Sequence, residues 1–166
     1  MARITDVEDL LREVKNIMVT GDALNAKILE IETQKITDGV GVTPTLAPVD
    51  STNGYFLQSW SEKILNINPA IFYGAEQVDV TDGGGVVAKI YKIAVYIILV
   101  DNGMTNDISS RIFRYSRALE ELFKGADIDG VGKLKVEGLL PISMPNDFNS
   151  SDEIKLGGIT LTIPLA

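Results

Sequence analysis

The chain contains neither cysteine nor histidine. The lack of cysteine excludes disulfide bonds, thiolate zinc sites and cysteine nucleophiles. The lack of histidine removes the commonest general base and a common transition-metal ligand, so catalysis would depend on carboxylate, lysine, serine or tyrosine side chains. We therefore expect no metal and no cofactor, and an enzyme is the less favoured class of protein.

Long apolar runs are also missing. The longest uninterrupted run covers residues 93–100, whereas a helix that spans a bilayer needs about 20 apolar residues. Residues 1–9 turn acidic at once and contain no apolar segment of the kind found in secretory signals. The sequence therefore predicts a protein that is made and kept in a reducing cytoplasm and has no membrane partner.

Basic residues are scarce, since 15 Lys and Arg face 23 Asp and Glu and the net charge is -8. This balance opposes binding of a polyanion by the molecule as a whole, so nucleic acid is not an expected direct ligand. The 166 residues, 45% of them hydrophobic, predict one domain over 1–166. Within it we expect a helical hairpin in 1–34, an extended loop in 35–53, and a sheet with a helix in 54–166.

One stretch, Lys89–Val100, organises the rest of the chain. It is rich in β-branched and aromatic residues and ends at Asp-Asn-Gly, which predicts a long strand. From Ile93 onward every residue is apolar, and because side chains alternate along a strand, both faces must be covered. The helix expected to end near Gly125 can cover one face. Another layer, or another copy of the protein, must cover the other.

Helical spacing marks the N-terminal segment. Thr5 or Asp6 can cap a first helix that Gly21 ends, and Asp22 can start a second. The apolar positions of the two helices follow the i, i+3, i+4 rule. They are Val7, Leu10, Leu11, Val14, Ile17 and Met18 in the first, and Leu24, Ile28 and Ile31 in the second.

The remaining segments predict strands and one further helix. We expect a short strand at 54–57, a hairpin from Pro69 through a glycine tip at 83–85 into the long strand, and strands at 133–140 and 153–164. Between them, a helix capped by Thr105 or Asn106 carries apolar residues at helical spacing. The fold class is α+β, with an antiparallel or mixed sheet of about four strands and helices packed on one face.

Two features suggest a subunit interface. The loop 35–53 contains apolar residues among Gly, Pro and Thr, so it is either a mobile surface loop or an arm that orders against a neighbouring subunit. Three arginines fall three residues apart on the later helix, as a solvated face or as an ion-pair stripe between subunits. The candidate interface residues are Val40, Val42, Leu46, Arg111, Arg114 and Arg117.

Patterns that carry chemistry are weak. Residues 127–132 begin like a calcium loop, but positions five and twelve are Val131 and Gly138, so we reject a metal site. The triple glycine at 83–85 could form a phosphate-binding loop, but no Gly-Lys-Ser/Thr follows it, so it is better explained as a hairpin turn. A small enzyme that uses Asp79, Asp82, Asp101 or Asp107 remains an alternative, as does an adaptor that binds peptides through loop 35–53.

Several segments together resemble the neck and tail-completion proteins of tailed bacteriophages, in particular the tail-terminator group. They are Leu24–Glu32, the Gly/Thr/Pro loop, Pro69–Gly74, the long strand and Arg111–Phe123, and the similarity covers roughly residues 20–166. It is one of pattern and element order. A head-completion or connector protein, or another tail subunit, is an alternative within the same class.

The resemblance implies a structural virion protein with no catalytic residues. Such a protein would be made in the host cytoplasm and would form a hexameric ring on the last ring of the tail tube. Its implied partners are further copies of itself, the tail tube protein, a head-side neck or connector protein, and the tail sheath as a further candidate. DNA would only pass through the channel, which suits an acidic protein.

Overall fold

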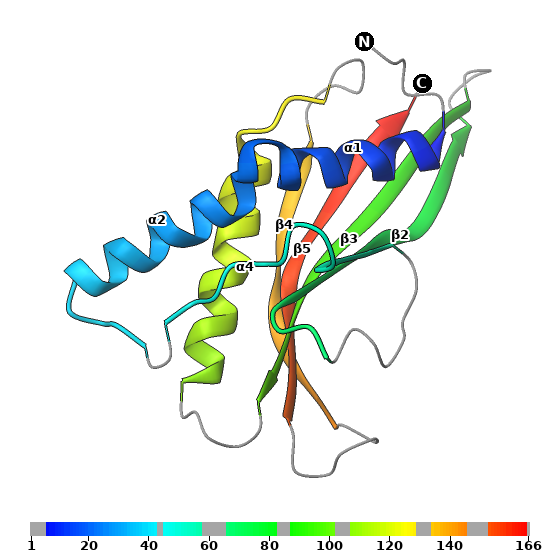
Figure 1. The fold of residues 1–166 in the computed structure, drawn as a ribbon. Helices are drawn as coiled ribbons and strands as arrows, with labels where there is room; N and C mark the ends of the chain where they lie inside the picture. The colour runs from blue at the N-terminus through cyan, green and yellow to red at the C-terminus, as the bar shows by residue number, and fades with distance from the viewer. Residues whose placement is uncertain are drawn as a thin grey trace.

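The computed structural model describes residues 6–42, 45–57, 66–82, 87–101, 107–128, 134–145 and 153–165. Its elements are α1 (Val7–Val19), the 3-10 helix η1 (Thr20–Asp22), α2 (Ala23–Thr37), β1 (Tyr55–Leu57), β2 (Ala70–Asp82), β3 (Val87–Asp101), α4 (Ile108–Lys124), β4 (Lys135–Pro145) and β5 (Glu153–Leu165). The predicted α+β class is confirmed, as are the pair of N-terminal helices and the long strand (Figure 1).

The strands form one mixed sheet in the order β1-β2-β3-β5-β4. β1 runs parallel to β2, and every other neighbouring pair is antiparallel. Asp82 pairs with Val87, which confirms the β2–β3 hairpin; its glycine tip, 83–85, lies outside the described residues. β3 occupies the centre of the sheet and pairs with its two neighbours, β2 and β5, along nearly its whole length.

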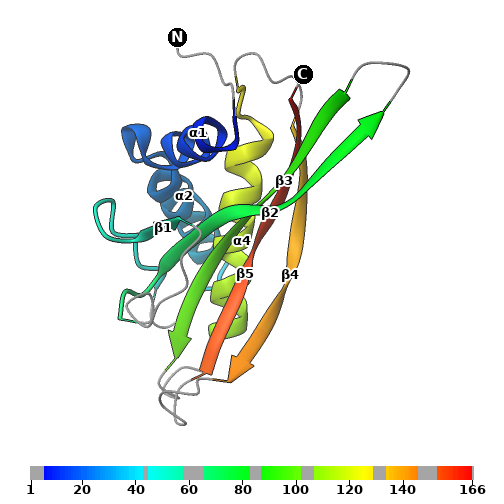
Figure 2. The same ribbon diagram turned by 90° about the vertical axis from the view of Figure 1, so that its right-hand side faces the viewer.

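The helices lie on one face of the sheet, as predicted (Figure 2). α4 packs on β3, β4 and β5, α1 packs on β2, and α2 packs on α4. Alternate residues of β3 point into this layer and are almost fully buried: Ile93, Val95, Ile97 and Leu99. The main core therefore lies between the central strands and the helices.

Local signals explain the helix ends. The Asp6 carboxylate caps α1 by accepting a hydrogen bond from the Asp9 amide at 2.9 Å. Gly21 and Asp22 both adopt positive φ angles, of 62° and 57°, and turn the chain between α1 and α2. α2 therefore leaves the end of α1 in a new direction (Figure 1). α2 continues to Thr37, beyond the limit expected at residue 34.

α4 sits close to β5 because Gly157 has no side chain. A Cβ there would lie 2.3 Å from Ser116 Oγ and 2.9 Å from Ile112 Cγ1. The glycine pair at 157–158 therefore marks a close backbone approach, and the register with β3 is continuous across it. The N-cap of α4 is Asp107, which follows the two expected caps, Thr105 and Asn106, and Gly125 ends the helix.

β4 does not end at Pro141, as the sequence analysis expected, but continues to Pro145. β4 is an edge strand, so a proline that lacks a backbone N–H can be accommodated there. The pairing with β5 shifts register between Leu139 and Ile142, which places the irregularity around the proline. Consequently residues 141–145, which follow the strand expected at 133–140, also belong to β4.

Candidate interaction surface

The extended segment 38–54 is fastened to α2 by one asparagine. The Asn25 side-chain amide donates to the Val49 carbonyl at 2.9 Å, and its carbonyl oxygen accepts from the Val49 amide at 2.8 Å. A side-chain amide can satisfy a backbone N–H and C=O in this way where no strand is available. Val49 itself is 1% exposed, so this point of the segment is part of the core.

Two residues of α4 hold the same segment. The Tyr115 hydroxyl donates to the Ala47 carbonyl at 2.7 Å, and Arg114 Nη2 donates to the Val40 carbonyl. The sequence left open a mobile loop or an arm laid on a neighbour. These contacts fix the described part of the segment to its own chain, where it forms part of the outer surface of the helical layer. A contact of this segment with a neighbouring subunit stays a prediction.

A buried ion pair lies beneath this segment. Arg114 Nη1 is 3.0 Å from Glu32 Oε2, and the two side chains are 9% and 6% exposed. Arg111 is also buried, so two arginines share the interior with one carboxylate. Glu32 Oε1 and Arg111 Nε have no hydrogen-bond partner within the part of the chain that the structure describes. Burial raises the pKa of Tyr115 to about 12, and the nearby Arg111 charge partly opposes that rise.

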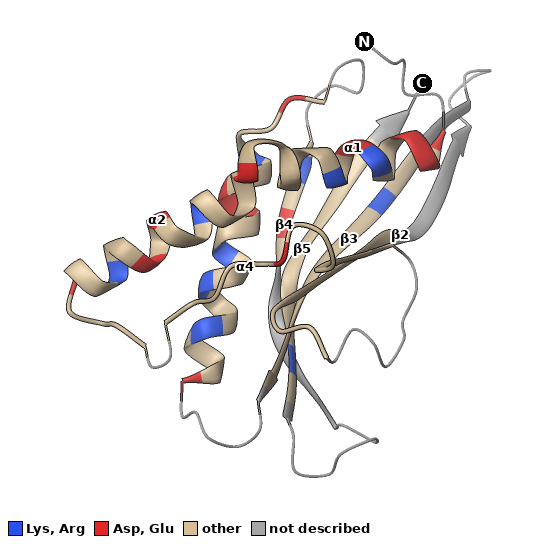
Figure 3. Cartoon of the chain, viewed as in Figure 1, with Lys and Arg blue, Asp and Glu red and all other residues tan. Residues whose placement is uncertain are grey.

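The six predicted interface residues divide into two groups. Val42, Arg111 and Arg114 are buried and make contacts within the chain. Val40 is 49% exposed, Leu46 is partly buried, and Arg117 lies at the surface beside Glu121 at 2.6 Å. The row of basic residues on α4 is visible in Figure 3, but part of it turns inward. For the three accessible residues, a role between subunits stays a prediction.

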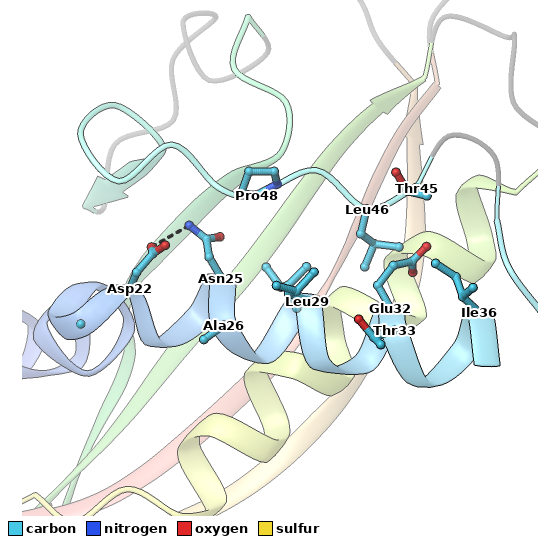
Figure 4. A pocket seen from close by; sticks show the side chains of 12 residues that line it. Asp22, Asn25, Ala26, Leu29, Glu32, Thr33, Ile36, Thr45, Leu46 and Pro48 are labelled. Carbon is cyan, nitrogen blue, oxygen red and sulfur yellow. Dashed lines mark hydrogen bonds between the residues drawn. The ribbon is translucent and has the colours of Figure 1, made fainter. Parts of the chain in front are cut away.

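A groove runs along α2 opposite residues 45–48 (Figure 4). It has a volume of about 640 Å³. Its walls are largely apolar, and two of the wall residues on α2, Leu29 and Ile36, are 67% and 54% exposed. The described lining residues are Gly21, Asp22, Asn25, Ala26, Ile28, Leu29, Glu32, Thr33, Ile36, Thr45, Leu46 and Pro48.

Sequence reasoning missed this groove. It selected the stripe of α2 that faces the core, formed by Leu24, Ile28 and Ile31, and gave no role to Leu29 and Ile36. A signal was present, because these two residues lie seven positions apart and therefore share one side of a helix. A helix with apolar residues on two sides has two surfaces to cover.

A second apolar surface lies on the sheet face opposite the helices. We call it the open face; its cluster consists of Ala70, Ile98, Ile154 and Leu156 with Phe56, Ile67, Phe72, Tyr96 and Val100 packed against them. No described helix covers it (Figure 2). Ile98 is fully buried within the cluster, whereas Phe72, Tyr96 and Val100 are only partly buried. The sequence analysis expected that another layer or another copy must cover the second face of the long strand. In the structure, residues of the same chain bury part of that face.

The carboxylates of the enzyme hypothesis do not converge. Asp82 pairs with Val87 at one end of β3, and Asp101 is the last residue at the other end. Fourteen strand steps separate those ends, roughly 45 Å at about 3.3 Å a step. Within the described ranges, no group of three or more acidic residues is placed to hold a metal ion. Nor does that part of the chain contain a helix long and apolar enough to cross a membrane.

No protein-family model and no curated protein matches this chain. Among solved structures, it is similar to a chain of "Virion of native gene transfer agent (GTA) particle", with 14% sequence identity and a TM-score of 0.46. The match covers 89% of this chain and 98% of that one. Likeness at this level does not carry function from one protein to another, because one fold hosts many functions.

Proposed function

We propose that this protein is a structural virion subunit that forms a ring, ends a phage tail tube and joins it to the head-side neck. The observation that carries the proposal is the open face of the sheet. It presents Phe72, Tyr96 and Val100 half-buried, and the described helices all lie on the other side. The sequence resemblance to tail-terminator proteins supports the specific role.

A ring offers a physical reason for this surface. Burying apolar area contributes roughly 25 cal/mol per Å², and a neighbouring copy can provide that cover without additional sequence. Most oligomers of a single chain are closed and symmetric, and a head-to-tail contact that closes gives a ring. We propose six copies, as in the family that the sequence resembles.

The proposed partners follow from this position. They are the tail tube protein on one side and a head-side connector protein on the other, with the sheath as a further candidate. A net charge of -8 suits a ring through which DNA passes without adhering. The proposal needs no cofactor and no catalytic residue, and it places the protein in the virion after synthesis in the host cytoplasm.

Light scattering and negative-stain microscopy of the purified protein test the ring. We expect particles of one diameter and a mass that is a fixed multiple of 18.0 kDa. Added to purified tail tubes, the protein should bind tube ends and stop further growth. A strict monomer at high micromolar concentration that leaves tube growth unchanged would overturn the proposal.

A matched pair of variants tests the open face. Phe72→Ser should weaken the ring, and circular dichroism checks that the monomer remains folded, because Phe72 also packs against the buried cluster of its own chain. Leu122→Ser, an apolar-to-polar change on the helical side, should leave the ring intact, since Leu122 is also partly buried. Equal effects of both changes on ring mass would contradict a role for the open face.

A further inference from the structure

A chemically labile pair of residues, Asn53–Gly54, lies in the turn that precedes β1. Asparagine is a thermolabile residue, and a following glycine makes it more reactive because no side chain shields the glycine nitrogen. The sequence holds a second such pair at 102–103, which lies outside the described residues. We propose that Asn53 is a site of deamidation and that Asp50 keeps it unreactive in the folded chain. This proposal is independent of the proposed ring.

Deamidation begins when the glycine nitrogen attacks Cγ of the asparagine side chain. A bond forms between these two atoms, the Cγ–Nδ2 bond breaks, and Nδ2 leaves as ammonia with the proton of the glycine nitrogen. Water then opens the resulting five-membered imide ring at one of its two carbonyls, which gives aspartate or isoaspartate. Water is the only co-reactant, so the geometry and freedom of the turn decide the rate.

The attacking atom, the Gly54 nitrogen, is held by the fold. Its N–H donates to the Asp50 carbonyl at 2.8 Å, and the Gly54 carbonyl accepts from the Ile71 amide of β2 at 2.7 Å. Asn53 is exposed to water, whereas Gly54 is buried. The nitrogen must lose its proton and approach Cγ, so the turn has to open locally before the reaction can start.

The Asp50 carboxylate holds the asparagine itself. Its Oδ1 accepts from the backbone amides of Thr52 and Asn53 at 2.8 and 3.0 Å, and its Oδ2 lies 3.4 Å from Asn53 Nδ2. The hydrogen bond from the Asn53 amide, followed by the one from Thr52, lowers the pKa of Asp50. The carboxylate is therefore ionised in neutral and alkaline solution, where deamidation is fastest, and remains a strong acceptor.

Packing explains why the labile pair contains a glycine. A Cβ at Gly54 would lie 2.6 Å from the Asp50 carbonyl oxygen and 2.7 Å from Val49 Cγ1. Val49 is 1% exposed and belongs to the core, so it has little room to move away. The turn needs glycine at this position and therefore carries the risk of deamidation, which the Asp50 contacts offset.

The first experiment compares the wild-type chain folded and unfolded in guanidinium chloride, both in mildly alkaline buffer. Deamidation replaces an NH2 group by OH, and mass spectrometry of proteolytic peptides detects the mass gain at Asn53. We expect the reaction to be slower in the folded chain by about tenfold or more, the equivalent of about 1.4 kcal/mol for local opening. Equal rates in the folded and unfolded chains would overturn the proposal.

Variants of the same protein test the role of Asp50. In Asp50→Ala the acceptor is lost, and in Asp50→Glu the carboxylate moves by one methylene group, so Asn53 should deamidate faster in both folded variants. Asp50→Asn retains an oxygen that can accept from the two backbone amides and should stay slow. The control is Asp38→Ala, which removes an exposed carboxylate that accepts from Gln34 in another turn and should also stay slow.

Circular dichroism checks that each variant is folded before the rates are compared. Asp50→Glu keeps the charge and nearly the size of the native residue, so it provides the comparison even if Asp50→Ala does not fold. A folded Asp50→Glu that deamidates at the wild-type rate would overturn the role of Asp50. Acceleration by Asp38→Ala as large as that by Asp50→Glu would overturn it as well, because the effect would then not be specific to this turn.

Discussion

Two Arg–Glu pairs on α4 differ in burial and allow one sharp prediction. Arg114 and Glu32 are 3.0 Å apart with side chains 9% and 6% exposed, whereas Arg117 and Glu121 are 2.6 Å apart with side chains 49% and 33% exposed. Distance alone would rank the second pair as stronger. Burial reverses that order, because water and mobile ions screen the exposed pair.

The expected magnitudes follow from this difference. Removing one partner of a buried pair leaves an uncompensated charge and typically costs about 3–5 kcal/mol. We therefore expect Glu32→Met and Arg114→Met each to lower the free energy of unfolding by that amount. In the double variant neither charge of the pair remains and only that of Arg111 is left, so the two losses should not add, and the coupling energy should be about 2–3 kcal/mol. The same cycle with Arg117→Ala and Glu121→Ala should give about 0.3–0.5 kcal/mol.

Urea unfolding followed by circular dichroism measures both cycles. The protein must be dilute enough to be monomeric, because assembly adds to the apparent stability. A coupling energy below about 1 kcal/mol for the buried pair, or one no larger than that of the exposed pair, would refute the reasoning. It would mean that the α2–α4 contact does not depend on this interaction.

Two further predictions concern the packing of α4. Gly157→Ala should lower the free energy of unfolding by about 1–3 kcal/mol, since its Cβ would lie 2.3 Å from Ser116 Oγ. Adding Ser116→Ala to the same chain should recover part of this loss. Gly125→Ala, whose nearest contact would be at 4.0 Å, should leave the thermal unfolding temperature nearly unchanged. The Tyr115 pKa of about 12, above its ordinary value of 10.0, predicts that stability depends on pH. Below pH 10 the full stability is present. Between pH 10 and 12 only the unfolded state loses the tyrosine proton, so the free energy of unfolding falls by up to about 2–3 kcal/mol. Tyr115→Phe should remove part of this fall in urea titrations at pH 8 to 12. The rest comes from Tyr55, whose pKa is also raised to about 12, and from Tyr73, whose pKa burial also raises. An unchanged fall would contradict the assignment.

Elements with strong local patterns could be predicted from the sequence. The alternation and composition of β3, the spacing of α4 and the N-cap at Asp6 are all local signals, and the structure confirms them. The continuation of β4 through Pro141 could not be predicted, because only the position of a strand in the sheet decides whether a proline is tolerated. Strand order depends on pairings that no short segment encodes.

The candidate surface was harder to predict for a similar reason. Arg114 has the spacing of a solvated stripe, and its partner, Glu32, is 82 positions away in the chain. The groove depends on Leu29 and Ile36 facing a segment that Asn25 and Tyr115 hold in place. Periodicity finds the side of a helix that faces the core, but contacts between distant segments determine what lies on the other side.

The long separation between Glu32 and Arg114 has a consequence for biosynthesis. A ribosome adds about 5–20 residues each second, so the 82 positions between them correspond to roughly 4–16 s of translation. α1 and α2, of 13 and 15 residues, are only marginally stable as isolated helices. α2 must therefore wait for α4 before it can dock, and the hollow beside Leu29 takes shape only once most of the polypeptide exists.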